Sequence, residues 1–122
     1  MDYKLELIMV PVSDVDRAKA FYEQVGFHVD NDAVVSDELR FVQITPPGSA
    51  CSIAIGKGLN EAPAGSAPGL QVVVDDVRAA REDLISRGID VSEVQELPWG
   101  TFVFFSDPDE NPWSVQQLPA WG

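Results

Sequence analysis

The chain has little of several residue types that common functional sites require. Its 122 residues include one cysteine and one histidine, and no apolar run approaches the roughly 20 residues that cross a bilayer. Cys51 alone cannot form an internal disulfide, which favours a cytoplasmic protein. The N-terminus has no basic region followed by an apolar stretch, so we expect no signal peptide. A hydrolase-type triad would have to use His28 as its base.

Basic residues are also scarce. The chain has 8 lysine and arginine residues against 20 aspartate and glutamate residues, and its formal net charge is −12. Phosphate backbones would be repelled, so a nucleic-acid partner is not expected, and neither is a membrane partner. The acidic balance is compatible with a cationic ligand, although solubility is the simpler explanation.

The chain contains two copies of one sequence pattern. Asp14 and Asp76 are 76 − 14 = 62 residues apart, and Gly26 and Gly88 have the same offset. Ser13 or Asp14 can cap the start of a helix in the first copy, and Asp75 or Asp76 in the second, and each glycine suits a left-handed end. The period is about half the chain, which indicates one duplicated unit and not a repeat array.

Each copy predicts a strand, a helix and three further strands. Apolar residues recur at helical spacing after each aspartate, and short apolar runs are separated by turn residues such as Asn31-Asp32. We expect one domain over 1–122, made of module 1–56 and module 68–119, joined by a Gly-, Ala- and Pro-rich linker, 57–67. The expected strands are 5–12, 27–30, 39–44, 51–55, 70–74, 89–95, 101–105 and 113–117. The expected helices are 15–25 and a second one that follows its capping aspartate and runs to about Arg87.

Three stretches resemble one known family. They are the run from Val10 to Tyr22 with Gly26-Phe27, the run from Val74 to Val77 with Gly88-Ile89, and the turn from Phe105 to Trp113. The chain resembles the vicinal oxygen chelate superfamily, which includes glyoxalase I, extradiol dioxygenases and the bleomycin-resistance proteins, and it is most similar to small glyoxalase-like members. The resemblance implies an α+β fold in which two βαβββ modules form a cupped mixed sheet with the helices outside. It also implies a homodimer.

The resemblance also indicates where a divalent metal would bind. Family ligands are His, Glu or Gln side chains on inward-facing strand positions, which fall here at Leu7, Gly69, Ser114 and near Cys51 to Ile53. Leucine has no lone pair and glycine has no side chain, so this set cannot replace the solvent shell of Zn²⁺, Ni²⁺ or Fe²⁺. Gln71 can share the inward face with Gly69, but it is a neutral amide. We therefore expect no metal, no cofactor and no catalytic residue.

Strand alternation divides the aromatic residues near the C-terminus between two faces. Phe102 and Phe104 share one face, and Val103 and Phe105 share the other. One set packs beneath the helices, and the other lines a cavity or a dimer seam. The predicted ligand-binding residues are Leu7, Met9, Gln43, Ile53, Gln71, Trp99, Phe102, Phe104, Ser114 and Gln116. We expect His28 to be an exposed polar residue and Cys51 a buried structural one.

The favoured function is a metal-free small-molecule binding protein of the bleomycin-resistance type. Its ligand would be partly apolar or aromatic, and the charge of the chain is compatible with a cationic one. The alternative is a divalent-metal-dependent lyase, isomerase or dioxygenase of the glyoxalase type. A third hypothesis is a structural or regulatory dimer with a filled cavity.

Overall fold

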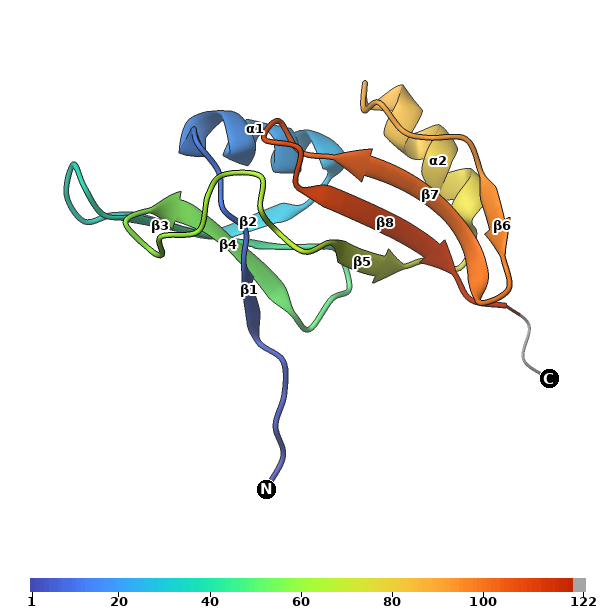
Figure 1. The fold of residues 1–122 in the computed structure, drawn as a ribbon, viewed down its shortest axis with the longest axis horizontal. Coiled ribbons are helices and arrows are strands. Elements are labelled where there is room, and N and C mark those ends of the chain that lie inside the picture. Colours follow the sequence, from blue (N-terminus) through green and yellow to red (C-terminus); the bar gives the residue numbers. More distant parts are fainter. Residues whose placement is uncertain (120–122) are drawn as a thin grey trace.

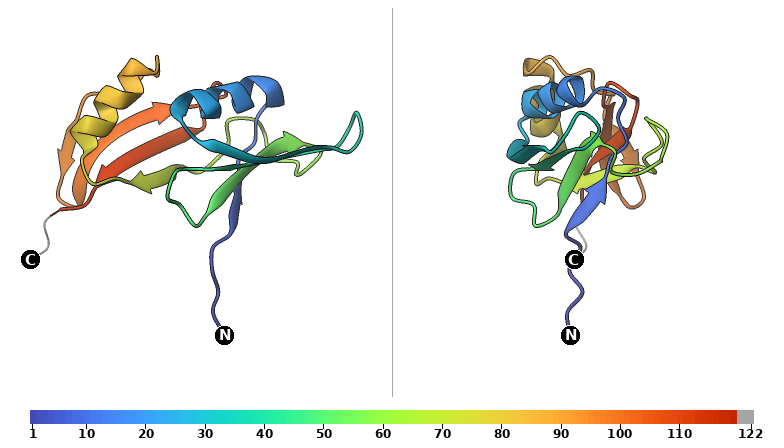
Figure 2. Two further views of the ribbon diagram at one scale, coloured as in Figure 1. Left: turned by 180° about the vertical axis from the view of Figure 1, so that it is seen from behind. Right: turned by 90° about the vertical axis from the view of Figure 1, so that its left-hand side faces the viewer.

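Two four-stranded sheets lie side by side, and both helices lie on the same side of them (Figures 1 and 2). The structure is a computed structural model, and it describes residues 1–119. It confirms the expected α+β architecture, with a strand, a helix and three strands in each module. The elements are β1 (Leu7–Met9), α1 (Val15–Val25), β2 (His28–Val34), β3 (Arg40–Thr45), β4 (Ser52–Lys57), β5 (Leu70–Val73), α2 (Val77–Ser86), β6 (Gln95–Leu97), β7 (Gly100–Ser106) and β8 (Pro112–Gln117).

The strand order is the same in both modules. Sheet A has the order β1-β4-β3-β2, and sheet B has the order β5-β8-β7-β6. In each sheet the strand before the helix pairs in parallel with the last strand of its module, and the remaining pairs are antiparallel. The duplication seen in the sequence is therefore a duplication of topology.

The helix ends follow the duplicated residues. Asp14 accepts a hydrogen bond from the Arg17 N–H, and Asp76 accepts from the N–H groups of Arg78 and Ala79. Gly26 ends α1 with φ at 106°, the left-handed conformation that glycine adopts without strain. Of the two candidates at each helix start, the structure uses Asp14 and Asp76, and the bounds of α1 match the prediction.

Neither helix among residues 1–119 is long and apolar enough to cross a membrane.

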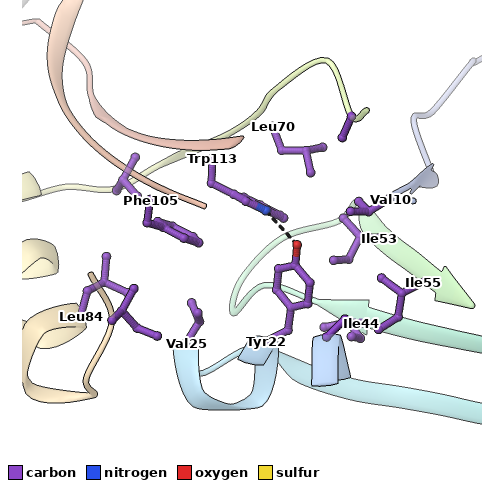
Figure 3. Close-up of a cluster of buried hydrophobic side chains, with 14 of the residues drawn as sticks. Val10, Tyr22, Val25, Ile44, Ile53, Ile55, Leu70, Leu84, Phe105 and Trp113 are labelled. Carbon is purple, nitrogen blue, oxygen red and sulfur yellow. Dashed lines mark hydrogen bonds between the residues drawn. The ribbon is translucent and has the colours of Figure 1, made fainter. Parts of the chain in front are cut away.

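One hydrophobic core spans both modules. Tyr22 and Val25 of α1 pack in the same cluster as Ile44 and Ile55 of sheet A and Trp113 of sheet B (Figure 3). The Tyr22 and Trp113 rings lie 5.7 Å apart between centroids. Because α1 contributes to the core of both sheets, the two modules are held in one arrangement.

A buried polar network reinforces this junction. The Tyr22 hydroxyl donates to Asp107 Oδ2 over 2.8 Å and accepts from Trp113 Nε1 over 3.0 Å. Asn111 Nδ2 donates to Asp107 Oδ2 and to the Pro11 carbonyl, both over 2.8 Å. The network joins α1, the loop before it and the β7–β8 turn, so it ties the first module to the second.

Every expected strand differs in its bounds from the structure, and three of them differ by more than two residues at one end. A strand over 5–12, buried on both faces, was wrong: β1 pairs only with β4, and Leu5 is 68% exposed. β2 runs through the Asn31-Asp32 pair that was expected to turn, because Arg40 and Lys19 both donate to Asp32 and hold this strand in place.

The expected strand over 89–95 is mostly a loop. The Ser92 N–H donates to the Phe104 carbonyl and Ser92 Oγ accepts from the Phe104 N–H, each over 2.9 Å. Regular pairing with β7 begins only at Gln95. The bond from the Phe104 N–H to Ser92 Oγ replaces the regular backbone pairing of a strand. An apolar sequence pattern cannot predict such a side-chain bond.

Each sheet has one face toward the helices and one face away from them. The helix side holds alternate strand residues of the core, including Val42, Ile44, Val103, Phe105 and Val115. We call the other side the open face. On sheet A the open face presents Leu7, Met9, Phe41, Gln43, Thr45 and Ser52, and on sheet B it presents Gln71, Phe102, Phe104, Ser114 and Gln116.

Candidate functional site

The open face of sheet B combines aromatic and amide side chains. Phe102 and Phe104 are two residues apart on β7, and their rings are nearly parallel, with centroids 5.8 Å apart and an interplanar angle of 3°. Phe102 is buried, whereas Phe104 is half-buried. Phe104 therefore presents an aromatic surface on which a flat ligand can stack.

A chain of hydrogen bonds orients the amides beside these rings. Ser114 Oγ donates to Gln71 Oε1 over 3.2 Å, and Gln71 Nε2 donates to Gln116 Oε1 over 2.6 Å. Gln116 Nε2 donates in turn to the Trp99 carbonyl over 2.9 Å. An amide nitrogen has two N–H donors, so the exposed Gln71 keeps one further donor for a ligand, whereas Gln116 is buried.

A hollow of about 600 Å³ adjoins this face, which is within the usual size of a ligand pocket. Its lining includes Phe104, Ser114, Trp113, Gly69 and Asp90. A smaller hollow of about 140 Å³ lies at the junction of the sheets and shares Gly69 and Trp113 with the larger one. The two hollows are therefore neighbours, and their walls together include residues from the open face of sheet B and from β4 of sheet A.

The structure brings most of the predicted ligand-binding residues to the open faces. Gln71, Phe102, Phe104, Ser114 and Gln116 lie on sheet B as described above. Leu7, Met9 and Gln43 lie on the open face of sheet A, and all three are half-buried. Their role in ligand binding stays a prediction.

Two predicted residues have other positions. Ile53 lies on the helix side of β4, where it is 3% exposed and packs near Tyr22, although one edge of it lines the small hollow (Figure 3). Trp99 lies in the turn between β6 and β7 with 58% exposure. Ile53 is therefore mainly a core residue, and the exposed Trp99 side chain lies at the edge of sheet B.

The strand register corrects one expected metal position. Leu7 pairs with Ser52 in sheet A, and the matching pair in sheet B is Gln71 with Ser114. Gln71, and not Gly69, is thus the counterpart of Leu7. Five residues separate β1 from α1 but only three separate β5 from α2, so the offset of 62 becomes 64 in these strands.

The four side chains at these matched positions do not suit a divalent metal. They are Leu7, Ser52, Gln71 and Ser114, which provide no carboxylate, imidazole or thiolate. Among residues 1–119, no three His, Cys, Asp or Glu side chains are grouped so that they could hold a metal ion. The donor set that defines the family's metalloenzymes is therefore missing from the corresponding strands.

The remaining candidates have simple structural roles. The His28 side chain is 78% exposed, as expected for a polar residue at the start of a strand. Cys51 is half-buried at the edge of the small hollow, so the expectation of a buried cysteine was wrong. Another hollow, of about 580 Å³, lies at the start of α1, but the Arg40 side chain on its wall is already paired with Asp16 and Asp32.

Sequence reasoning missed two polar residues of sheet A, Asp30 and Thr45, and it considered Ser52 only within the expected metal position near Cys51 to Ile53. Asp30, Thr45 and Ser52 form a hydrogen-bonded row beside Gln43. The row depends on a β-bulge in β2, for which the sequence offers no signal. The difference in length between the two strand-to-helix loops could have identified Gln71 as the counterpart of Leu7. The capping aspartates fix where each loop ends, so the strand positions can be counted back from them.

The fold and the matched strand positions agree with one protein family. The family model of the Glyoxalase/Bleomycin resistance protein/Dioxygenase superfamily matches residues 4–115. This chain belongs to that superfamily. The uncharacterized protein YetH of Bacillus subtilis (strain 168) is similar to it, with 26% identity over 113 residues, which are 90% of this chain and 94% of YetH.

Solved structures show the same architecture. TnmS3, an antibiotic binding protein from Streptomyces sp. CB03234, is 36% identical, with a TM-score of 0.85 over 97% of this chain and 98% of TnmS3. A glyoxalase/bleomycin resistance protein from the same organism is 37% identical, with a TM-score of 0.79 over 93% of this chain and all of that one. UcmS2 is 30% identical, with a TM-score of 0.79 over 95% of this chain and 98% of UcmS2.

Proposed function

We propose that this protein is a metal-free small-molecule binding protein that sequesters an antibiotic-like compound with a flat aromatic part. The main support is the open face of sheet B, where Phe104 and Ser114 line a hollow of about 600 Å³ and Ser114 is hydrogen-bonded to the amide of Gln71, which lines the smaller hollow beside it. Such a surface combines stacking with a few directed donors, as ligand pockets do. The likeness to TnmS3, which is described as an antibiotic binding protein, adds support.

A thermal-shift screen against polycyclic aromatic antibiotics tests this proposal. A ligand present at 100 times its Kd adds about 2.7 kcal/mol to the free energy of unfolding, so a true ligand raises the melting temperature clearly. Phe104→Ala should weaken binding of each hit by about 1–2 kcal/mol, because the stacking surface is lost. Ile85→Ala is the matched control, since this exposed apolar residue lies on α2, away from the open faces.

The alternative is a divalent-metal-dependent lyase, isomerase or dioxygenase. Elemental analysis of protein purified without chelator separates it from the binding protein. We expect less than stoichiometric Ni, Zn, Fe and Mn after gel filtration. A stoichiometric metal at that stage would overturn the metal-free proposal.

We extend the proposal to a homodimer in the cytoplasm, in which a second copy covers the open faces. Support comes from large apolar residues that one copy leaves exposed at the rims of its sheets, namely Val34, Val35, Val73, Leu97 and Trp99. Burial of such residues against a partner is favourable. Sedimentation equilibrium should give about twice the 13.3 kDa mass of one chain, and a monomer at micromolar concentration would contradict the extension.

A further inference from the structure

The strand carboxylates differ in how they are paired. Strands β1 to β8 contain three of them, Asp30 and Asp32 in β2 and Glu96 in β6. Asp32 binds Arg40 and Lys19, with N–O distances of 2.8 and 2.9 Å, and Glu96 lies 3.3 Å from Arg78. No lysine or arginine of residues 1–119 lies within 4 Å of Asp30, whose nearest basic group is His28 Nε2 at 3.6 Å.

A β-bulge places Asp30 on the open face of sheet A. The register of β2 against β3 shifts between Val29 and Asn31, so Asp30 has no partner on β3. Its carboxylate accepts instead from Thr45 Oγ1, and Thr45 belongs to the open face. Bulges commonly redirect a side chain beside a functional site.

The carboxylate is part of a built polar row. Thr45 Oγ1 lies 2.6 Å from Ser52 Oγ, and Gln43 Nε2 donates to Ser52 Oγ over 3.3 Å. Ser52 is buried and lines the small hollow at the junction of the sheets, and Gln71 lines the same hollow. The row therefore runs from Asp30 to the small hollow, whose wall also includes Gln71 of sheet B.

No lysine or arginine on the open faces balances this carboxylate, and the basic group beside it is the exposed His28 imidazole. Only two of the 8 lysine and arginine residues are in strands, Arg40 and Lys57. They are paired across β3 and β4 on the helix side, where Arg40 binds Asp16. The strand positions of the open faces thus hold one carboxylate and no lysine or arginine, so their local charge favours a cation.

We propose that Asp30 is a specificity-determining residue that selects ligands bearing a protonated amine. This inference rests on the function proposed above and names the chemistry of the ligand. Thr45 donates to Asp30 Oδ2, and Asp30 Oδ1 lies 3.6 Å from the exposed His28 imidazole. The Asp30 side chain is 34% exposed, so an ammonium group can reach Oδ1 from solvent. A charge-assisted hydrogen bond of this kind is stronger than a neutral one. The aromatic part of the same ligand would stack on the open face of sheet B.

The test uses matched pairs of probes that differ only in charge. The pairs are daunorubicin, tryptamine and 1-naphthylmethylamine, each with its N-acetyl derivative, and calorimetry measures their Kd at pH 7 in low and high salt. We expect at least one amine to bind about tenfold or more tightly than its N-acetyl derivative. Asp30→Asn should abolish that difference, because asparagine keeps the shape and the Thr45 bond without the charge.

Glu38→Gln is the control for net charge, since it removes one charge from the exposed β2–β3 hairpin and leaves the open face intact. It should preserve the preference for the amine. Equal binding of both forms, or a preference that survives in Asp30→Asn, would overturn the role of Asp30 while the binding function stands. If no probe and no compound of the antibiotic screen binds, the proposed function fails, and this inference fails with it.

Discussion

At the scale of single residues, Tyr22 is the most constrained polar group of the core. It is fully buried, it donates to Asp107, and it accepts from Trp113. Burial raises the pKa of its hydroxyl, with the Asp107 carboxylate acting in the same direction. Tyr22 is therefore a neutral donor at all physiological pH values, and its role is to connect the modules.

Tyr22→Phe should lower the free energy of unfolding by about 1–3 kcal/mol. The substitution keeps the ring but leaves Trp113 Nε1 without its acceptor, and it removes one of the donors to Asp107, in a buried place. Urea unfolding at pH 7 measures the loss. Tyr3→Phe is the matched control, since Tyr3 is 91% exposed, and it should change stability by less than about 0.5 kcal/mol. Equal effects of the two variants would contradict the role of the network.

Asp32 should give the stability a defined pH dependence. Hydrogen bonds from Arg40 and then Lys19 hold the pKa of this carboxyl well below its usual range. A pKa that is depressed in the folded state adds stability above the unfolded pKa of about 4, and this contribution falls as the pH drops below it.

The corresponding experiment compares wild type with Asp32→Asn between pH 7 and pH 2. The variant should be less stable at pH 7, and the difference in unfolding free energy should be constant down to about pH 4 and shrink below it. Asp37→Asn is the control, because Asp37 lies in the exposed hairpin and forms no ion pair among the described residues. If the difference in unfolding free energy between wild type and Asp32→Asn grew at low pH, the ion pairs of Asp32 would not stabilise the fold.

At the scale of elements, the duplicated aspartates make the helix starts predictable. Asp76 accepts two backbone hydrogen bonds at the start of α2, each of 3.1 Å. Asp76→Ala should therefore cost about 0.5–2 kcal/mol in chemical denaturation. Asp75→Ala removes the same charge one position earlier, where the side chain forms no cap, and it should be nearly neutral. A larger loss in Asp75→Ala than in Asp76→Ala would contradict the assignment of the cap.

The elements also show which parts of the fold a sequence can predict. α1 was predicted to the residue because its apolar spacing, its capping aspartate and Gly26 agree. β6 and the bulge of β2 were not, since both depend on side-chain bonds formed only after folding, such as Ser92 with Phe104 and Thr45 with Asp30.

For the candidate site, the sequence predicted which side chains share a face of a strand, but not which residues pair between neighbouring strands. Alternation correctly placed Phe102 and Phe104 opposite Val103 and Phe105, since the period of a strand is local. The pairing of Gln71 with Ser114 is a long-range register, and a two-residue difference in loop length displaced the expected position to Gly69. Whether Gln71 or Gly69 occupies this position, it and the other matched residues do not suit a divalent metal.

At the scale of the whole molecule, the shared core should make unfolding a single transition. Asn111 joins three segments, because it accepts from the Ala67 N–H and donates to the Pro11 carbonyl and to Asp107. Differential scanning calorimetry should therefore show one cooperative transition in which both modules unfold together.

Asn111→Ala should lower the melting temperature without dividing this transition. The substitution removes bonds between the modules, but α1 still packs against Trp113 and Phe105 in the common core. A loss of about 1–3 kcal/mol is expected from the buried groups left without partners. Asn60→Ala, in the exposed segment between β4 and β5, is the control and should have little effect. Two separate transitions in wild type, each sensitive to substitutions in one module only, would show that the modules fold independently and that their arrangement is not fixed by the shared core.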